Sequence, residues 1–417
     1  MSNPSIQNSP PTNSQLKRLW LMILSRGLVG ISTLLLLGSI VGIWRLKVFV
    51  DHDLVPLANK GLTTTLNRPV KLGVVKSFSL TGVEFTASEI PATDTDPDRV
   101  NIKSVNVGFD PWQLIINRNL QLDVTLVSPD IYIEQDNQGR WLTTTIAVPT
   151  EKGPIETNLD KLRLRDAHIV LLPKENAKEK ISLRVPVGFT GINGTVQLLD
   201  KNRLIKLDLA GKAVSEGDIS IIGDLILEKS LVGNLRVKAR NILASDITRI
   251  IASPLTLQSG KVNGDLEIKV LPSQKTLLYG NATIEGATVQ ISKVPQLLIN
   301  TQGNISFDGP VIKLDHLVTN YGQIPLTASG TIDQQTGFNL KGRVHAVSLA
   351  NAQTTLKVKL PIPVSGIARA DLQISGGISQ PVLSGNISTL KTTQIDKVNF
   401  SEVSGKFELI SSKSLLN

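Results

Sequence analysis

From residue 68 onward, apolar and polar residues alternate along many short segments. Residues 205–209 read Ile-Lys-Leu-Asp-Leu, and the same two-residue period recurs at 235–240, 265–270 and 370–374. Because successive side chains of a β-strand point to opposite faces, each segment predicts a strand with one apolar and one polar face. Glycine, asparagine and aspartate separate these segments at short intervals, which is typical of strands joined by turns. The pattern therefore predicts a mainly β protein.

Helical periodicity is rare in this part of the chain. The best helical candidates beyond residue 68 are 111–117 and 244–251, and a short helix is predicted after Asp53, where leucine and alanine recur at helical spacing up to Leu66.

The N-terminal segment has a different character. Residues 27–44 contain no charged residue, and a helix of that length spans about 27 Å, close to the thickness of a hydrocarbon core. A cleaved signal peptide is the alternative, but its apolar region is shorter and ends in small residues, whereas Trp44-Arg45-Leu46-Lys47 follows here. We therefore predict an uncleaved transmembrane anchor over 19–47, preceded by a disordered tail over 1–18.

The positive charge of the chain is concentrated around that anchor. The formal net charge is +9, of which the five basic and no acidic residues of 1–50 supply +5, leaving 9 − 5 = +4 for the remainder. These anchor flanks are Lys17, Arg18, Arg26, Arg45 and Lys47. Such a distribution favours membrane flanking over a nucleic-acid footprint, which needs a clustered basic stripe. Three basic residues precede the apolar core and two follow it, which favours a cytoplasmic N-terminus with the long C-terminal body on the other side of the membrane.

An internal repeat links two parts of the β-rich region. Ser259-Gly260 and Asp265-Leu266 match Ser365-Gly366 and Asp371-Leu372 at an offset of 365 − 259 = 106, and Gly280-Asn281 matches Gly385-Asn386. The repeat predicts large sheet modules joined end to end. We divide the chain after the anchor into 48–150, a β-sheet module at 151–258, one repeat at 259–364 and an incomplete second repeat at 365–417.

The sequence offers little catalytic chemistry. There is no cysteine, and the four histidines stand alone without metal-ligand spacing. Asp94-Thr-Asp96-Pro-Asp98 lacks the glycine and glutamate of a calcium loop, so we interpret it as a solvated acidic turn. Glycines 188, 191 and 194 are interpreted as turn residues between strands. We predict no catalytic residue, no metal site and no cofactor, and therefore no enzyme.

Four motifs, taken in order, carry a resemblance to a known family. They are Leu66-Asn-Arg-Pro-Val-Lys-Leu-Gly73, Asp110-Pro-Trp, Val127-Ser-Pro-Asp130 and Asn137-Gln-Gly-Arg-Trp141. Their order resembles the N-terminal module of the AsmA-like superfamily, especially TamB-type translocation and assembly proteins of the cyanobacterial and plastid-envelope kind. The chain is similar to the N-terminal part of such proteins, and their C-terminal domain, which would dock onto an outer-membrane barrel partner, is expected to be absent.

The resemblance implies an elongated, curled antiparallel β-sheet whose apolar face forms a groove for phospholipid acyl chains between the inner and outer membranes. An assembly factor for outer-membrane proteins, lending open strand edges to its substrates, is the alternative, and an envelope-spanning tether is a second. A continuous apolar face would favour the first function, exposed strand edges the second and a filled sandwich the third. The candidate groove positions are Ile205, Leu207, Leu209, Leu235, Val237, Leu266, Ile268, Leu372 and Ile374.

Overall fold

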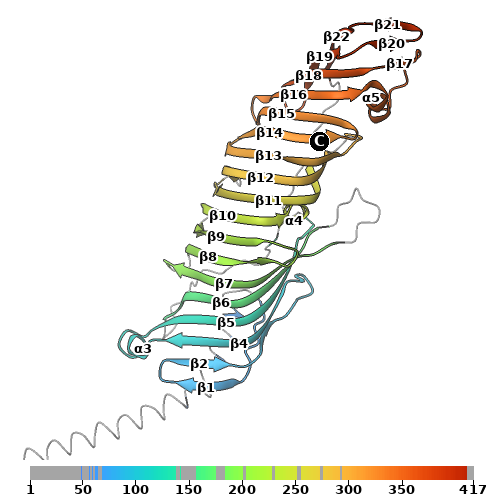
Figure 1. Cartoon of the computed structure of the whole chain (residues 1–417). Coiled ribbons are helices and arrows are strands. Elements are labelled where there is room, and N and C mark those ends of the chain that lie inside the picture. Colours follow the sequence, from blue (N-terminus) through green and yellow to red (C-terminus); the bar gives the residue numbers. More distant parts are fainter. Residues whose placement is uncertain are drawn as a thin grey trace, which may run out of the picture.

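One long sheet of 19 strands dominates the computed structural model, and a second sheet of three strands lies at its C-terminal end (Figure 1). At about 4.8 Å per strand, the main sheet is on the order of 80 Å long. The residues that the structure describes are 48, 56, 59, 62–63, 68–137, 141, 156–174, 184–200, 203–227, 231–250, 255–272, 276–291 and 294–410.

The predicted membrane anchor cannot be compared with the structure. Its range, its five basic flanks and the predicted N-terminal tail lie outside the described residues. Within the part of the chain that is described, none of the helices has the length and apolar character needed to cross a membrane.

The strands are long and follow one another closely in the chain. The main sheet contains β1 (Val75–Ser79), β2 (Gly82–Phe85), β3 (Ser88–Ile90), β4 (Arg99–Phe109), β5 (Asn119–Glu134), β6 (Glu156–Leu172), β7 (Val187–Leu199), β8 (Leu204–Ala213), β9 (Asp218–Leu227), β10 (Leu231–Leu243), β11 (Leu255–Val270), β12 (Thr276–Ile291), β13 (Leu298–Gly309), β14 (Val311–Tyr321), β15 (Ile324–Asp333), β16 (Gly337–Ser348), β18 (Ile367–Gly376), β19 (Val382–Thr389) and β22 (Ser404–Ile410). The small sheet contains β17 (Val364–Ser365), β20 (Thr393–Ile395) and β21 (Val398–Phe400).

Each strand of the main sheet pairs with its successor along the chain, from β4 through β16 to β18, β19 and β22, while β2 and β3 share the other edge of β4. The pairing is antiparallel except between β5 and β6, which run parallel. The expectation of a purely antiparallel sheet is therefore wrong, and the sheet is mixed. The chain between Glu134 and Glu156 is long enough for the crossover that a parallel pair requires.

β-bulges recur at several points along the sheet. Asp166 in β6, Asn241 in β10 and His316 in β14 have positive φ angles of 52°, 53° and 47° beside register shifts. Their backbone N–H groups, released from the ladder, donate to side chains of the next strand at 3.0, 2.8 and 3.3 Å; the acceptors are Asn193, Asn263 and Ser329. Because a bulge bends its strand and increases the local twist, their repetition curves the sheet along its length.

Within the described part of the chain, three short helices lie in connections between paired strands. Helices α3 (Pro111–Asn117) and α4 (Ala244–Ile250) confirm the two predicted helices, and α5 (Leu349–Leu356) was not predicted. Asp110 caps α3 by accepting from the backbone N–H groups of Trp112 and Gln113. Ser348 caps α5 in the same way through Asn351. Helices α4 and α5 lie on the same side of the sheet, at the ends of strands (Figure 1).

The two repeat blocks occupy equivalent positions in the sheet. Asp265 of β11 pairs with Asn281 of β12, and Asp371 of β18 pairs with Asn386 of β19. In both blocks the next residue, a leucine, faces a glycine, and an arginine of the preceding strand forms an ion pair with the aspartate. The repeat seen in the sequence therefore reflects a repeated strand register, while the proposed domain boundaries stay predictions.

Candidate functional site

An uninterrupted row of apolar residues and glycines crosses the main sheet from β2 to β18. Each member is the direct cross-strand partner of the next, so all of them lie on the same face of the sheet. The row consists of Phe85, Val105, Leu126, Leu164, Gly194, Leu209, Ile221, Val237, Leu266, Gly280, Phe307, Ile312, Ile332, Phe338 and Gly376. We call it the first apolar row.

A second apolar row runs beside the first and extends the same face to the last strand. Its members are two residues away from those of the first row on each shared strand. They are Gly211, Ile219, Ala239, Gly264, Ala282, Ile305, Leu314, Gly330, Leu340, Ile374, Leu383 and Leu409. The side of the sheet that carries both rows is called the apolar face below.

The structure places all nine candidate groove positions on the apolar face. Leu209, Val237 and Leu266 belong to the first row and Ile374 to the second. The other five lie an even number of residues from these on the same strands, namely Ile205, Leu207, Leu235, Ile268 and Leu372. All nine side chains are half-buried, whereas the residues between them, such as Lys206 and Glu267, are exposed. Contact of these positions with a ligand stays a prediction.

The opposite face is polar and carries charges of both signs. Nε of Arg236 lies 3.1 Å from Asp265 Oδ1, and Nε of Arg343 lies 2.8 Å from Asp371 Oδ1. The side chains of these pairs are at least half exposed, so each contributes little to stability. Their effect is instead to fix which face meets water, because a one-residue slip of any strand would place charges on the apolar face.

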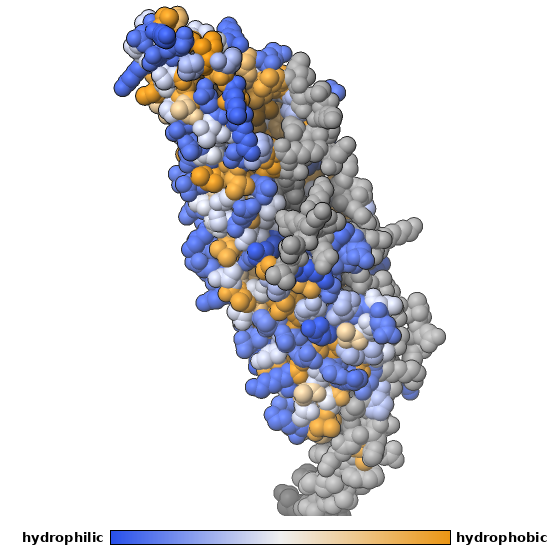
Figure 2. All heavy atoms as spheres, turned by 90° about the vertical axis from the view of Figure 1, so that its right-hand side faces the viewer, coloured by the Kyte–Doolittle hydropathy of each residue, from blue (hydrophilic) through white to orange (hydrophobic). Residues whose placement is uncertain are grey.

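Within the described residues, no second sheet packs face to face against the apolar face, and the strands contact chiefly their hydrogen-bonded neighbours and the helices. Helix α4 covers one margin, where Ala244 and Ile247 pack with Val262, Ile284 and Val289. Figure 2 shows hydrophobic residues at intervals along the whole length of the molecule, between hydrophilic ones. An apolar surface of this extent on a single-layer sheet is typical of a binding surface.

Glycines on the apolar face allow neighbouring backbones to approach closely. Gly280 and Gly330 lie inside strands with φ angles of 113° and 134°, which residues with a side chain rarely adopt. A Cβ atom at either position would lie only 2.2 Å from a carbonyl oxygen of the adjacent strand. Glycine in a strand interior permits such kinks, so these positions contribute to the curvature of the sheet without adding polar groups to the face.

A hollow of about 930 Å³ lies over the polar face between β14 and β22. Lys341, Lys406, Glu408 and the Arg343–Asp371 pair are among its lining residues. The lining thus mixes positive and negative groups, and the charges of Arg343 and Asp371 neutralise each other. This hollow therefore lacks the convergent polar groups of a small-molecule site.

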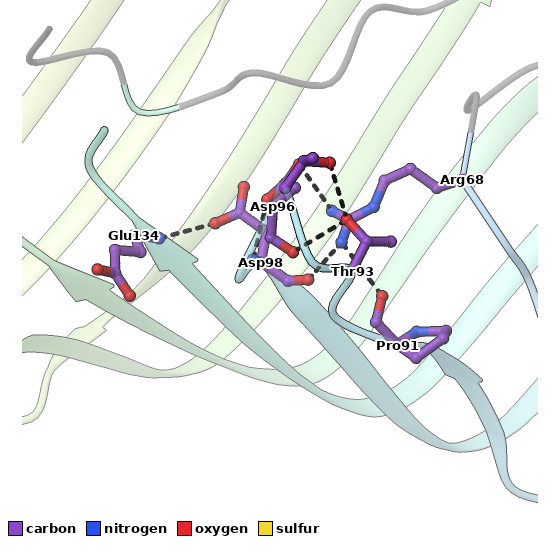
Figure 3. Close-up of polar contacts among 7 residues, drawn as sticks. Arg68, Pro91, Thr93, Asp96, Asp98 and Glu134 are labelled. Atoms are coloured by element: carbon purple, nitrogen blue, oxygen red, sulfur yellow. Dashed lines mark hydrogen bonds and ion pairs between the residues drawn. The ribbon is translucent and has the colours of Figure 1, made fainter. Parts of the chain in front are cut away.

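A buried polar cluster ties the N-terminal strands together (Figure 3). Nη1 of Arg68 lies 3.3 Å from Asp96 Oδ2, and its Nη2 donates to the carbonyl oxygens of Pro91 and Asp98. The Asp98 carboxylate accepts from the backbone N–H of Glu134 at 2.8 Å. The prediction of a solvated acidic turn is wrong for Asp96 and Asp98, because a guanidinium group fills the space among their oxygens and both side chains are largely buried.

The pH dependence of stability should change when Asp98 is neutralised. Burial raises the pKa of the Asp98 carboxyl above its usual 3.8, and the hydrogen bond from Glu134 opposes this shift. The native state therefore holds the proton more tightly than the unfolded state, and the contribution of Asp98 to stability falls as the pH rises through the raised pKa. We expect the urea midpoint of wild type, relative to Asp98→Asn, to decrease between pH 4 and neutrality. A difference independent of pH would contradict this expectation.

The isolated histidines do not form a site among the described residues. Nδ1 of His168 lies 2.9 Å from Asp130 and that of His316 lies 3.0 Å from Asp315, while His345 lies beside Thr327. Across the described part of the chain, no group of three histidine or acidic residues is placed to hold a metal ion. Glycines 188, 191 and 194 lie inside β7 rather than in turns, so that interpretation is corrected; Gly191, with φ 59°, belongs to the β7 bulge.

Comparison with known proteins adds a family match. A family model described as the TamB C-terminal domain matches residues 202–409. The expectation that the chain lacks this domain is therefore wrong. A chloroplastic protein of rice (Oryza sativa subsp. japonica), named SUBSTANDARD STARCH GRAIN 4, is 25% identical over 166 residues, which cover 39% of this chain and 8% of that protein. No solved structure matches the chain.

Proposed function

The chain belongs to the TamB family, and we propose that its apolar face carries phospholipid acyl chains between the inner and outer membranes. The large sheet and the family fit a role in lipid or protein transport in a cell envelope, and proteins of this family are not enzymes. The observation that supports lipid most directly is the first apolar row, in which no polar side chain occurs from β2 to β18.

The chemistry of this face suits acyl chains. Burial of apolar surface contributes about 25 cal/mol per Å², or about 0.8 kcal/mol for each methylene group. The rows consist mostly of aliphatic side chains and glycine, so neighbouring positions offer an acyl chain nearly the same environment. A lipid could therefore move from strand to strand without leaving one strongly preferred position. No charged side chain in either row would hold a particular headgroup.

The proposal places the predicted anchor at 19–47 in the inner membrane and the sheet in the periplasm. This orientation rests on the basic residues that flank the apolar segment. The bends of the sheet would turn the apolar face into a groove, with α4 and α5 along one margin. The polar face would then meet water along the whole path.

Two other functions remain candidates. An assembly factor that works with an outer-membrane barrel partner would use strand edges, and β22 pairs with β19 alone among the described strands. A structural tether would need no cargo and is expected to have a filled interior. The single layer of the described sheet weighs against a filled interior.

Site-specific photocrosslinking in cells tests the three functions. The probe is placed at Leu207, a half-buried position on the apolar face, and at its exposed neighbour Lys206 on the polar face as the matched control. We expect phospholipid to be trapped at Leu207 and not at Lys206. Unfolded outer-membrane protein trapped at Leu207 would favour the assembly function, and no adduct at either position would favour the tether.

A further inference from the structure

The small sheet and its surroundings expose an unusual number of large apolar side chains. Between 40% and 55% of the surface of each is accessible, and they are Leu356, Val358, Leu360, Ile362, Val398 and Phe400. They lie at the end of α5, in the segment that links α5 to β17, and in β21. Figure 2 shows hydrophobic residues gathered at this upper end of the molecule. We call this region, residues 356–364 and 390–403, the C-terminal lobe.

Backbone pairing brings the two segments of the lobe together. Val364 of β17 pairs with Ile395 of β20, and Ile395 pairs with Val398 of β21. The N–H of Asp396 donates to the carbonyl oxygen of Pro363 at 2.9 Å. The exposed residues around Ile362 therefore lie beside the β20–β21 turn, and the lobe presents one surface rather than scattered side chains.

The small sheet is itself amphipathic. Val364, Ile395 and Val398 share one face by direct pairing, and Phe400 pairs with Thr393 on that same face. Thr393 is buried, whereas Val398 and Phe400 are exposed. The apolar face of this small sheet is thus covered at its centre and open at the β21 edge.

Lysines accompany the exposed apolar residues. Residues 356–360 read Leu-Lys-Val-Lys-Leu. Lys391 precedes β20, and Lys397 lies in the turn between β20 and β21. All four lysines are exposed. The acidic residues of the lobe are Asp396 and Glu402. Protein interfaces are depleted of lysine, whereas anionic bilayers attract it, and its long stem allows apolar neighbours to enter the headgroup region.

We infer that the C-terminal lobe docks onto the surface of an anionic lipid bilayer. The apolar side chains insert at the level of the headgroups, and Lys357, Lys359, Lys391 and Lys397 contact lipid phosphates. The lobe adjoins the end of β19, where the N–H of Thr389 donates to the carbonyl oxygen of Val403 at 2.9 Å. The inference does not depend on the proposed transport of lipid, because a tether or an assembly factor could use the same docking surface.

A fluorescent reporter on the full chain tests the inference. Because the chain has no cysteine, Val398→Cys provides one labelling site for an environment-sensitive dye, and Gln373→Cys on the polar face is the matched control. The labelled proteins are titrated with vesicles of phosphatidylcholine, with or without phosphatidylglycerol. We expect a blue shift at position 398 only with the anionic vesicles. Neutralising two lysines, Lys357→Gln with Lys359→Gln, should raise the half-saturating lipid concentration about 30-fold.

Three results would overturn the inference. Equal responses at positions 398 and 373 would show that docking does not involve the lobe. A response at position 398 that is the same with neutral vesicles, or that survives the lysine substitutions, would remove the role of charge. A blue shift without vesicles that grows with protein concentration would show that a second copy of the chain covers the lobe. Failure here would leave the crosslinking result at Leu207 unaffected.

Discussion

Two aspartates on the apolar face of β11 should stop phospholipid from reaching the C-terminal strands. In the variant Leu266→Asp with Ile268→Asp, a photocrosslinking probe at Leu207 on β8 should still trap lipid, whereas a probe at Ile374 on β18 should trap almost none. Both substituted side chains belong to the apolar face, and β11 stands between the two probes in the sheet. The two probes therefore report lipid on either side of the substituted strand.

The expected effect is large because acyl chains cannot solvate a carboxylate. Bringing an unpaired charge into an apolar environment costs several kcal/mol, and a barrier of about 3 kcal/mol already reduces passage more than 100-fold. Among the described residues, those directly opposite positions 266 and 268 carry no positive charge that could neutralise the new aspartates: they are Val237, Gly280, Leu235 and Leu278.

Two controls separate the charge from the damage to the strand. The pair Leu266→Asn and Ile268→Asn keeps polar side chains of similar size without charge and should reduce the Ile374 adduct less. Asn263→Asp adds a charge to the polar face of the same strand, where it can still accept from the N–H of Asn241, and should leave the adduct unchanged. Undiminished lipid at Ile374 in the double aspartate variant would contradict transport along the apolar face.

The alternation of side chains allowed the apolar face to be predicted strand by strand. Within each strand the two-residue period assigns neighbours such as Leu207 and Lys206 to opposite faces. This assignment does not depend on which strands pair, because it follows from the geometry of a single strand. Continuity from strand to strand depends on register, and register is set by pairing and bulges that no single segment encodes. Gly194 and Gly280 complete the first apolar row, yet a glycine carries no apolar signal in the sequence.

Three features were predicted wrongly or missed from the sequence, each for a physical reason. The parallel pair of β5 and β6 depends on a long connection whose path is not determined by local pattern. Asp96 and Asp98 were interpreted as solvated because the partner that buries them, Arg68, lies about 30 residues earlier and is paired only in the fold. Helix α5 was missed because Leu349–Leu356 has a weak apolar period; Ser348, its N-cap, was the available signal.

Removing the Arg68 guanidinium should loosen the N-terminal strands. This side chain is about 10% exposed and binds Asp96 and the carbonyl groups of Pro91 and Asp98. It thereby ties the connection between β3 and β4 to the segment that precedes β1. In Arg68→Met the Asp96 carboxylate loses the guanidinium that balances its charge in a site where water reaches it poorly, although it still accepts from the backbone N–H of Asp98. Removing one member of a buried pair typically costs about 3–5 kcal/mol.

Hydrogen exchange of β2, β3 and β4 measures this effect locally, which suits a long sheet whose ends can open independently. Opening free energies in these strands should fall by about 3–5 kcal/mol in Arg68→Met, while those of β12 to β16 stay unchanged. The matched control is Lys71→Met, which breaks the ion pair with Glu89 at 2.7 Å; both of those side chains are more than 40% exposed, so the cost should stay below about 1 kcal/mol. Equal effects of the two substitutions would mean that burial does not strengthen the Arg68 cluster.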